Sequence, residues 1–271
     1  MPEAPLTSIC FKNLNSYKIR NIKFMPGLNG KTCLCLEIPL KEYRASLDLQ
    51  RNIALARQTG VIENDVVLIL EHPPVFTLGR RAGIENLKAS SAFLKRKKIP
   101  VISVERGGDI TFHGPGQLVV YPIIDLTKAG LKVMDYVANL EEIMLRTASD
   151  RGIPAKRNPV NRGIWVAGKK LGSVGISVKR GVSFHGFALN VNLSLKPFKW
   201  INPCGLTDVG VTSIEKELSQ KISMSQVREV VTHHFESVFG FDLVRIDDKK
   251  PDHLVNCCAA EDVFMKRSRS L

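Results

Sequence analysis

Long apolar runs are missing from this chain of 271 residues. A membrane-spanning helix needs about 20 consecutive apolar residues, and no uncharged apolar stretch of even about 18 occurs in the sequence. Residues 1–31 contain no continuous apolar segment of signal-peptide length, and Glu3 and several prolines interrupt them. We therefore expect neither a membrane span nor a secretory leader.

Cysteine is too sparsely placed to indicate a disulfide framework. The chain has six cysteines, and no two of them form a Cys-x-x-Cys pair, so we expect no structural zinc site. This usage fits a reducing compartment, which is the cytoplasm in a bacterium and the mitochondrion or plastid in a eukaryote. We favour the cytoplasm.

Acidic residues are outnumbered. Lys and Arg exceed Asp and Glu by 39 to 26, which gives a net charge of +13. The basic residues are dispersed and only 7% of residues are aromatic, a pattern that does not favour nucleic-acid binding. An acidic carrier protein would complement this positive charge. The simpler alternative is that the charge only keeps the surface soluble.

Helical and strand patterns are mixed along the chain. Helices are predicted at 41–60, 132–150 and 223–240, the last opened by a capping-box pattern at Ser223 and Gln226. Strands are predicted at 66–70, 100–104, 117–126, 163–167, 170–178 and 182–191, and the last three should form an antiparallel meander. This mixture predicts an α+β fold, with a mixed but largely antiparallel sheet and flanking helices.

Three glycine-marked segments lie at the ends of predicted strands, at 106–117, 170–175 and 185–186. Buried strands avoid glycine unless a backbone or a ligand approaches closely, so together these segments predict a binding site. Each segment by itself is also compatible with an ordinary turn or bulge.

One cysteine, Cys204, is flanked by Pro203 and Gly205. These neighbours favour a presented side chain, although a lone cysteine is more often a small buried apolar residue. A free thiol has a pKa of about 8.5, so a nucleophilic Cys204 needs a nearby cation or helix N-terminus. The candidate neighbours are Lys169, Lys170, His113 and His185.

Five motifs occur in a fixed order between about residues 66 and 214. They are EHPPVFTLG (71–79), RGGDITFHGPGQ (106–117) followed by YPI (121–123), GKKLGSVG (168–175), FHGFALNV (184–191) and NPCG (202–205). In this order they resemble the lipoyl(octanoyl) transferases, enzymes of lipoate biosynthesis. One departure is Gly172, where a bulkier small residue is common in the family.

The resemblance implies roles for individual residues. Cys204 matches the acyl-accepting nucleophile, and Lys170 matches the lysine that lowers the pKa of its thiol. Lys169 should point to the opposite face of its strand and be solvated. The implied substrate-binding residues are Arg106, Gly107, Gly108, Asp109, Ile110, Thr111, Phe112, His113, Ser173, Val174, Gly175, Gly186, Phe187 and Ala188. His113 and His185 could assist proton transfer or hydrogen-bond the loops. We expect Val75, Leu118 and Ile176 near an apolar slot for the acyl chain.

The resemblance also implies a reaction and its partners. An octanoyl group would pass from octanoyl-acyl carrier protein to Cys204 as a thioester, and then to a lysine of a lipoyl domain. The implied acceptors are the lipoyl domains of 2-oxoacid dehydrogenase complexes and the glycine cleavage H protein. No cofactor, metal, nucleic acid or membrane is expected to take part.

Two alternatives remain open. One is an ATP-dependent lipoate or biotin protein ligase, whose catalytic domain has a related fold. The other is a non-catalytic protein that uses its positive charge to bind a carrier protein or a nucleic acid. We expect a single catalytic domain at 32–246, an N-terminal extension at 1–31 and a C-terminal tail at 247–271.

Overall fold

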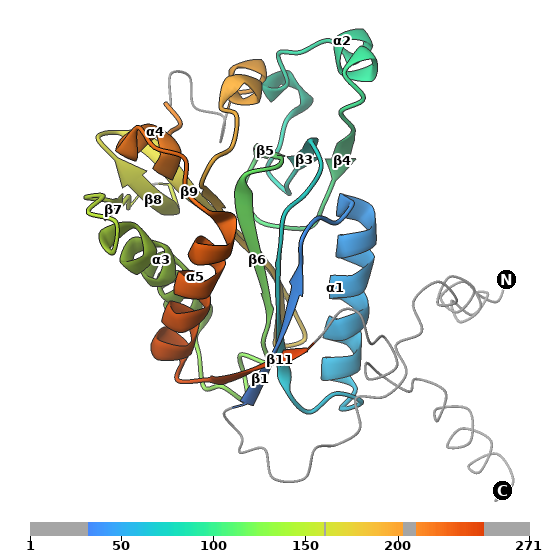
Figure 1. Ribbon diagram of the computed structural model, residues 1–271. Helices are drawn as coiled ribbons and strands as arrows, with labels where there is room; N and C mark the ends of the chain where they lie inside the picture. Colours follow the sequence, from blue (N-terminus) through green and yellow to red (C-terminus); the bar gives the residue numbers. More distant parts are fainter. Residues whose placement is uncertain (1–31, 160, 203–209, 247–271) are drawn as a thin grey trace, which may run out of the picture. The chain divides into compact units, whose positions relative to one another are not determined.

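A computed structural model describes residues 32–159, 161–202 and 210–246 (Figure 1). In these residues an eight-stranded sheet has the order β11-β1-β2-β6-β10-β9-β8-β7. Its strands are β1 (Thr32–Ile38), β2 (Asp65–Leu70), β6 (Gln117–Ile123), β7 (Lys156–Arg157), β8 (Gly163–Val166), β9 (Lys169–Lys179), β10 (Val182–Asn190) and β11 (Asp242–Ile246). β1 pairs in parallel with β2 and β11, whereas the other neighbours are antiparallel. The predicted mixed, largely antiparallel sheet and its β8–β9–β10 meander are confirmed.

A second, three-stranded sheet lies beside the first. It is built from β3 (Val75–Leu78), β4 (Val101–Ser103) and β5 (Ile110–His113), in the order β4-β3-β5. Two short 3-10 helices, η2 (Ile84–Asn86) and η3 (Lys196–Trp200), and the helix α2 (Ser91–Arg96) accompany it. The glycine-rich stretch 106–117 is therefore more than a connection, since it contains β5.

Helices cover both faces of the large sheet (Figure 1). α1 (Tyr43–Gln58) lies on one face, whereas α3 (Val133–Ser149) and α5 (Met224–Phe239) lie on the other. A shorter helix, α4 (Ile214–Leu218), precedes α5. Because both faces are covered, β2 is buried along its whole length. The three predicted helices are confirmed, and none of the helices in the described ranges has the length and apolar surface that a membrane crossing requires.

The ends of α5 differ in how well the sequence predicted them. Gly240 ends the helix with a φ of 68°, a left-handed conformation that suits glycine. Ser223 is the N-cap, but its side chain makes no capping bond. Its hydroxyl lies 2.7 Å from that of Ser225 instead, so the capping-box prediction was wrong in this detail.

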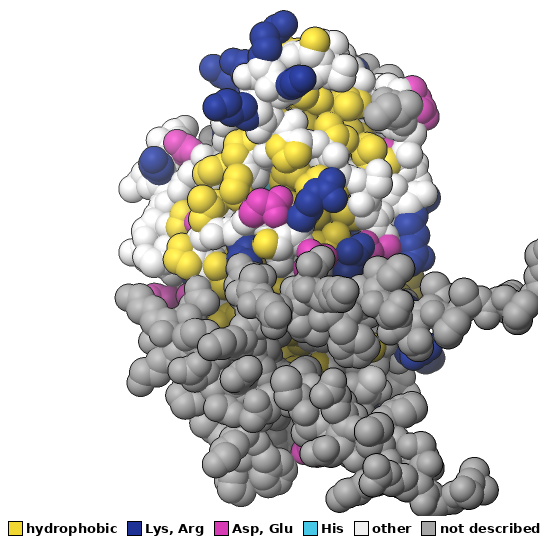
Figure 2. Space-filling model, turned by 90° about the vertical axis from the view of Figure 1, so that its right-hand side faces the viewer, with side chains coloured by type: hydrophobic (Ala, Val, Ile, Leu, Met, Phe, Trp, Pro, Cys, Tyr) yellow, Lys and Arg dark blue, Asp and Glu magenta, His cyan; other side chains and the backbone are white. Residues whose placement is uncertain are grey.

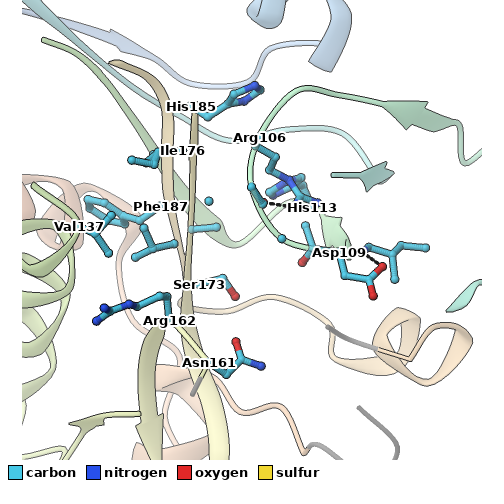
Figure 3. Close-up of a pocket in the computed structure, with 18 of the residues that line it drawn as sticks. Arg106, Asp109, His113, Val137, Asn161, Arg162, Ser173, Ile176, His185 and Phe187 are labelled. Carbon is cyan, nitrogen blue, oxygen red and sulfur yellow. Dashed lines mark hydrogen bonds between the residues drawn. The ribbon is translucent and has the colours of Figure 1, made fainter. Parts of the chain in front are cut away.

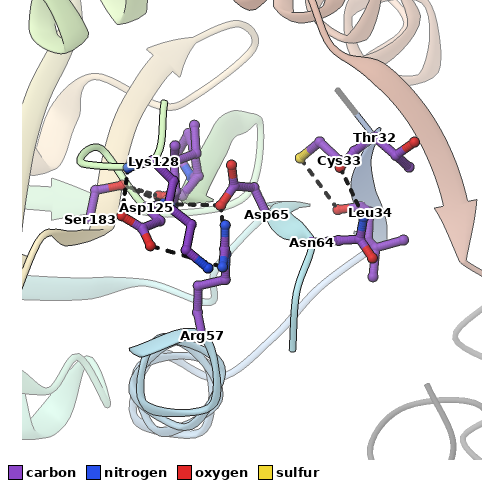
Figure 4. A network of polar contacts seen from close by, with 11 residues as sticks. Thr32, Cys33, Leu34, Arg57, Asn64, Asp65, Asp125, Lys128 and Ser183 are labelled. Atoms are coloured by element: carbon purple, nitrogen blue, oxygen red, sulfur yellow. Dashed lines mark hydrogen bonds and ion pairs between the residues drawn. The ribbon is translucent and has the colours of Figure 1, made fainter. Parts of the chain in front are cut away.

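A buried charge cluster fastens α1 to the sheet (Figure 4). Arg57, near the end of α1, donates from Nε to Oδ1 of Asp65 at 2.8 Å, and its Nη1 lies 3.9 Å from Oδ2 of Asp125. Oδ1 of Asp65 also accepts a hydrogen bond from the backbone of Asp125. Burial raises the pKa of Asp65, while its hydrogen bonds to the Asp125 backbone and to Arg57 act in the opposite direction.

Candidate functional site

A cavity of about 530 Å³ lies where the loop before β5 meets β9 and β10. Figure 3 shows Arg106, Asp109 and His113 on one side of these strands, and Val137, Phe187 and Arg162 on the other. The apolar side chains that line it include Val137 and Phe187. The cavity therefore has a polar wall and a second wall that is apolar apart from Arg162.

The cavity brings together three segments that are distant in sequence. Its lining includes the predicted residues Arg106, Gly107, Gly108, Asp109, Ile110, Thr111, His113, Lys170, Ser173, Val174, Gly175, His185, Gly186, Phe187 and Ala188. One backbone hydrogen bond joins two of the segments directly, because Gly107 N–H donates to the Ile176 carbonyl at 2.8 Å.

Three residues expected near the substrate lie elsewhere. Phe112 packs in the core of the small sheet, with its ring centroid 5.1 Å from that of Phe76. It points away from the cavity because successive side chains of a strand alternate, and its neighbours Thr111 and His113 face the cavity. Val75 and Leu118 are buried in other apolar clusters, so only Ile176 of the predicted slot residues lines this cavity.

Arg106 holds the glycine loop in place. Its guanidinium donates to the backbone carbonyl and the hydroxyl of Thr77, both at 2.8 Å, and to the Gly107 carbonyl at 3.0 Å. The loop approaches the end of β3 so closely that a Cβ at Gly79 would collide with the Gly108 carbonyl. Gly79 is therefore glycine for steric reasons, whereas Gly108 has a φ of 88°, a backbone conformation that suits glycine.

Lys170 is buried beside the cavity, with 6% of its surface exposed. Its ammonium donates to Oδ1 of Asn161 at 2.6 Å and lies 5.2 Å from the centre of the Trp165 ring. Lys169 is exposed, so the predicted alternation between the two lysines is confirmed.

Cys204 lies outside the described residues, but Asn202 before it and Gly210 after it are described. On one flank, Asn202 N–H donates to the Asn86 carbonyl at 2.8 Å, and the Asn86 side chain donates to Asp109 at 2.7 Å. On the other flank, Lys170 N–H donates to the Gly210 carbonyl at 2.8 Å. Asn202 is thus connected through Asn86 to Asp109, and Gly210 is bound directly to Lys170; Asp109 and Lys170 both line the cavity.

Histidines and tyrosines form the buried polar end of the site. Burial holds the pKa of His113 well below its usual range, and the charge of the neighbouring His72 adds a smaller effect in the same direction. The Nδ1 atom of His113 lies 2.7 Å from Oε1 of Gln117. Since that oxygen only accepts, Nδ1 carries the proton and Nε2 is an acceptor. His185 has a φ of 59°. Burial lowers its pKa, whereas Glu105, whose Oε2 lies 3.9 Å from Nε2 of His185, acts to raise it.

Comparison with known proteins identifies the family. Residues 42–236 match the model of the lipoyl protein ligase A/B catalytic domain. The chain is 44% identical to an octanoyltransferase of Desulfotalea psychrophila, over 76% of this chain and 93% of that protein. It is 46% identical to an octanoyltransferase of Syntrophobacter fumaroxidans, over 76% of this chain and 90% of that protein.

The chain belongs to the octanoyltransferase family.

Solved structures support the fold of this family member. Lipoate-protein ligase A bound with ATP superposes with a TM-score of 0.62 at 15% identity, covering 85% of this chain and 94% of that chain. A bipartite lipoate protein ligase from Thermoplasma acidophilum gives a TM-score of 0.58 at 16% identity, covering 87% and 92%. The predicted relation to the lipoate ligase fold is confirmed.

Several residues that line the cavity of this octanoyltransferase family member were missed by sequence reasoning. They are Tyr43, Arg81, Tyr121, Val137, Asn161 and Arg162. Tyr121 had a signal, because it begins the YPI sequence of the second motif. Asn161 had none, since it lies in a segment without periodicity and reaches Lys170 only through the folding of that segment against β9.

Proposed function

We propose that this acyltransferase moves an octanoyl group from octanoyl-acyl carrier protein to a lysine of a lipoyl domain, through a thioester on Cys204. The observation that carries the proposal is the similarity to proteins named octanoyltransferase over about nine-tenths of their length. Lipoyl domains of 2-oxoacid dehydrogenase complexes and the glycine cleavage H protein are the proposed acceptors.

The proposed reaction has two balanced steps. In the first, the Cys204 thiolate attacks the thioester carbonyl, the bond to the carrier's sulfur breaks, and that sulfur leaves as a thiol after taking a proton. In the second, a neutral lysine amine attacks the new thioester, an amide forms, and the Cys204 thiolate is released. Amide formation from a thioester runs downhill, so neither ATP nor a cofactor enters the scheme.

Lys170 has two proposed duties. Its cation would favour the Cys204 thiolate before acylation, and its neutral form could take the proton of the incoming amine. Support comes from its burial beside the cavity and from its hydrogen bond to Asn161. Further support is that its backbone N–H donates to the carbonyl of Gly210, the first described residue after Cys204.

The two walls of the cavity suit the two ends of an acyl thioester. Val137, Ile176 and Phe187 could contact the hydrocarbon chain, which gains free energy when it leaves water. Backbone N–H groups of the glycine loops could stabilise the oxyanion that develops at the thioester carbonyl.

An ATP-dependent lipoate ligase is the second candidate, favoured by the similarity in fold to a lipoate ligase bound with ATP. Such a ligase activates the free acid as an adenylate and needs no nucleophilic cysteine. The two candidates therefore differ in their requirement for ATP and for Cys204.

Denaturing mass spectrometry after incubation with octanoyl-acyl carrier protein tests the proposal. We expect one octanoyl adduct, on Cys204, formed without ATP and absent from Cys204→Ala. Cys10→Ala is the matched control and should keep the adduct, while Cys33 and Cys35, which are fully buried, should stay unmodified. A folded wild-type protein without an adduct, or full transfer by Cys204→Ala, would refute the covalent route.

The compartment and the domain limits complete the proposal. We place the enzyme in the cytoplasm, where free thiols such as those of Cys33 and Cys35 persist. Residues 32–246 are the proposed catalytic domain, with an extension on either side.

A further inference from the structure

Cations gather on two segments that flank the small sheet. Residues 79–104 contain seven Lys or Arg and a single acidic residue, Glu85, while residues 191–202 contain two lysines and no acidic residue. We refer to these nine residues as the α2–η3 cationic surface, which comprises Arg80, Arg81, Lys88, Lys95, Arg96, Lys97, Lys98, Lys196 and Lys199.

The two segments form one continuous surface. The backbone N–H groups of Lys88 and Ala89 both donate to the Trp200 carbonyl, at 2.9 and 3.2 Å. The Phe93 ring on α2 packs edge-on against the Trp200 ring on η3, with centroids 4.9 Å apart. Figure 2 shows Lys and Arg side chains gathered at the α2 end of the molecule, at the top of the view, beside apolar side chains.

The charge of this surface is not neutralised within the described part of the chain. All nine side chains are exposed, and none of them forms an ion pair with a carboxylate there. Exposed arginines elsewhere, such as Arg51 and Arg157, do form such pairs. A surface of one sign projects a field that attracts an oppositely charged partner and raises its association rate.

Arg81 connects the α2–η3 cationic surface to the cavity. Arg81 lines the cavity, and its backbone N–H donates to the Gly108 carbonyl at 3.1 Å. The cations of α2 and η3 do not line it. A protein docked on α2 and η3 would therefore have to reach the reaction site with an extended arm.

We propose that the α2–η3 cationic surface is the docking surface for an acidic acyl carrier protein, an inference that rests on the proposed function. A carrier presents its acyl group on a long phosphopantetheine arm, so it can dock away from the cavity. A lipoyl domain presents a lysine side chain, which is much shorter, so it must approach the cavity mouth itself. Half-buried Phe93 and Trp200, surrounded by cations, provide the aromatic contacts that stabilise protein interfaces.

Neutralising the surface tests the assignment without touching the cavity. One variant combines Lys95→Gln, Arg96→Gln and Lys97→Gln on α2. A second combines Lys196→Gln and Lys199→Gln on η3, so that the test does not depend on the stability of α2. The matched control loses three exposed lysines of other elements, through Lys128→Gln, Lys132→Gln and Lys179→Gln.

Two donors are compared at low ionic strength, octanoyl-acyl carrier protein and the uncharged thioester S-octanoyl-N-acetylcysteamine. We expect kcat/KM for the carrier to fall by at least about tenfold in both surface variants, with the small thioester unaffected and the control close to wild type. Added salt should reduce the difference, because it screens exposed charges.

Other outcomes would overturn the assignment. An unchanged kcat/KM for the carrier would exclude docking here, and an equal loss with both donors would indicate damage to the site. A loss that depends on the lipoyl-domain concentration alone would assign the surface to the acceptor. Failure of the wild-type protein to use either donor would instead refute the proposed function.

Discussion

Acid should destabilise this protein through His72, whose imidazole is fully buried on the loop after β2. Its Nδ1 lies 2.7 Å from the Lys41 carbonyl and its Nε2 lies 2.8 Å from the Tyr121 hydroxyl. A carbonyl only accepts, so Nδ1 carries the proton and Nε2 accepts from Tyr121. A second proton would have to enter at Nε2, where it would break this hydrogen bond in a site that water does not reach.

Burial lowers the pKa of His72 from 6.5 to about 4. In the unfolded chain the imidazole takes up a proton below pH 6.5, whereas in the folded protein it stays neutral until about pH 4. The unfolded state therefore binds more protons in this window, and stability falls as the pH falls. Each pKa unit corresponds to about 1.4 kcal/mol, so the difference between 6.5 and about 4 corresponds to a loss of stability of up to about 3–4 kcal/mol.

Urea unfolding of wild type and His72→Gln at a series of pH values measures this contribution. Glutamine can still hydrogen-bond but does not titrate, so the variant should lose about 2 kcal/mol less stability than wild type between about pH 7.5 and 5. Any constant cost of the substitution appears at every pH and does not affect this difference. His233→Gln, at an exposed position of α5, is the control and should keep the wild-type dependence. An equal acid sensitivity in wild type and His72→Gln would refute the reasoning.

Four further substitutions test the site and the fold. Lys170→Ala should slow alkylation of Cys204 by iodoacetamide near neutral pH because the thiolate fraction falls, and unchanged rates across the pH range would remove the lysine from that role. Asn161→Ala should lower kcat by about tenfold or more, since a hydrogen bond to a charged donor contributes about 1.5–3 kcal/mol; a wild-type kcat would show that the ammonium needs no such partner. Gly186→Ala should destabilise the fold by about 1–3 kcal/mol or prevent folding, because the new Cβ would collide with a backbone carbonyl of β6, and an unchanged Tm would contradict this. Arg57→Met should cost about 3–5 kcal/mol in urea unfolding by leaving a buried aspartate without its cation, and a cost below about 1 kcal/mol would show that the cluster is dispensable.

Much of the secondary structure was predictable because its signals are local. The periodicity of α3 and the glycine that ends α5 depend on near neighbours in sequence. The parallel strands β1 and β11 were missed, since their pairing joins residues about 200 positions apart and the buried β1 shows little alternation. Of the small sheet only β4 was predicted, at 100–104; β3 and β5 were missed because they are short and β5 lies within a glycine-rich segment.

The candidate site was likewise predictable only where its signals are local in the sequence. Alternation along β9 correctly predicted that Lys170 is buried and Lys169 is exposed. The same rule explains why Phe112 faces the core of the small sheet, but it could not be applied before β5 was known to be a strand. The partnership of Lys170 with Asn161 depends on the fold of the segment before β8, for which the sequence offers no pattern.

By itself, the sequence determined the positions of the main helices, the β8–β9–β10 meander and, through its ordered motifs, the family. These are properties of local spacing and of residue identity. Only the tertiary structure decided that the 106–109 loop lies against β9 and lines a cavity with it, and that the segments 79–104 and 191–202 join into one cationic surface. Both depend on contacts between segments far apart in the chain, which sheet order and loop closure set and which no local period encodes.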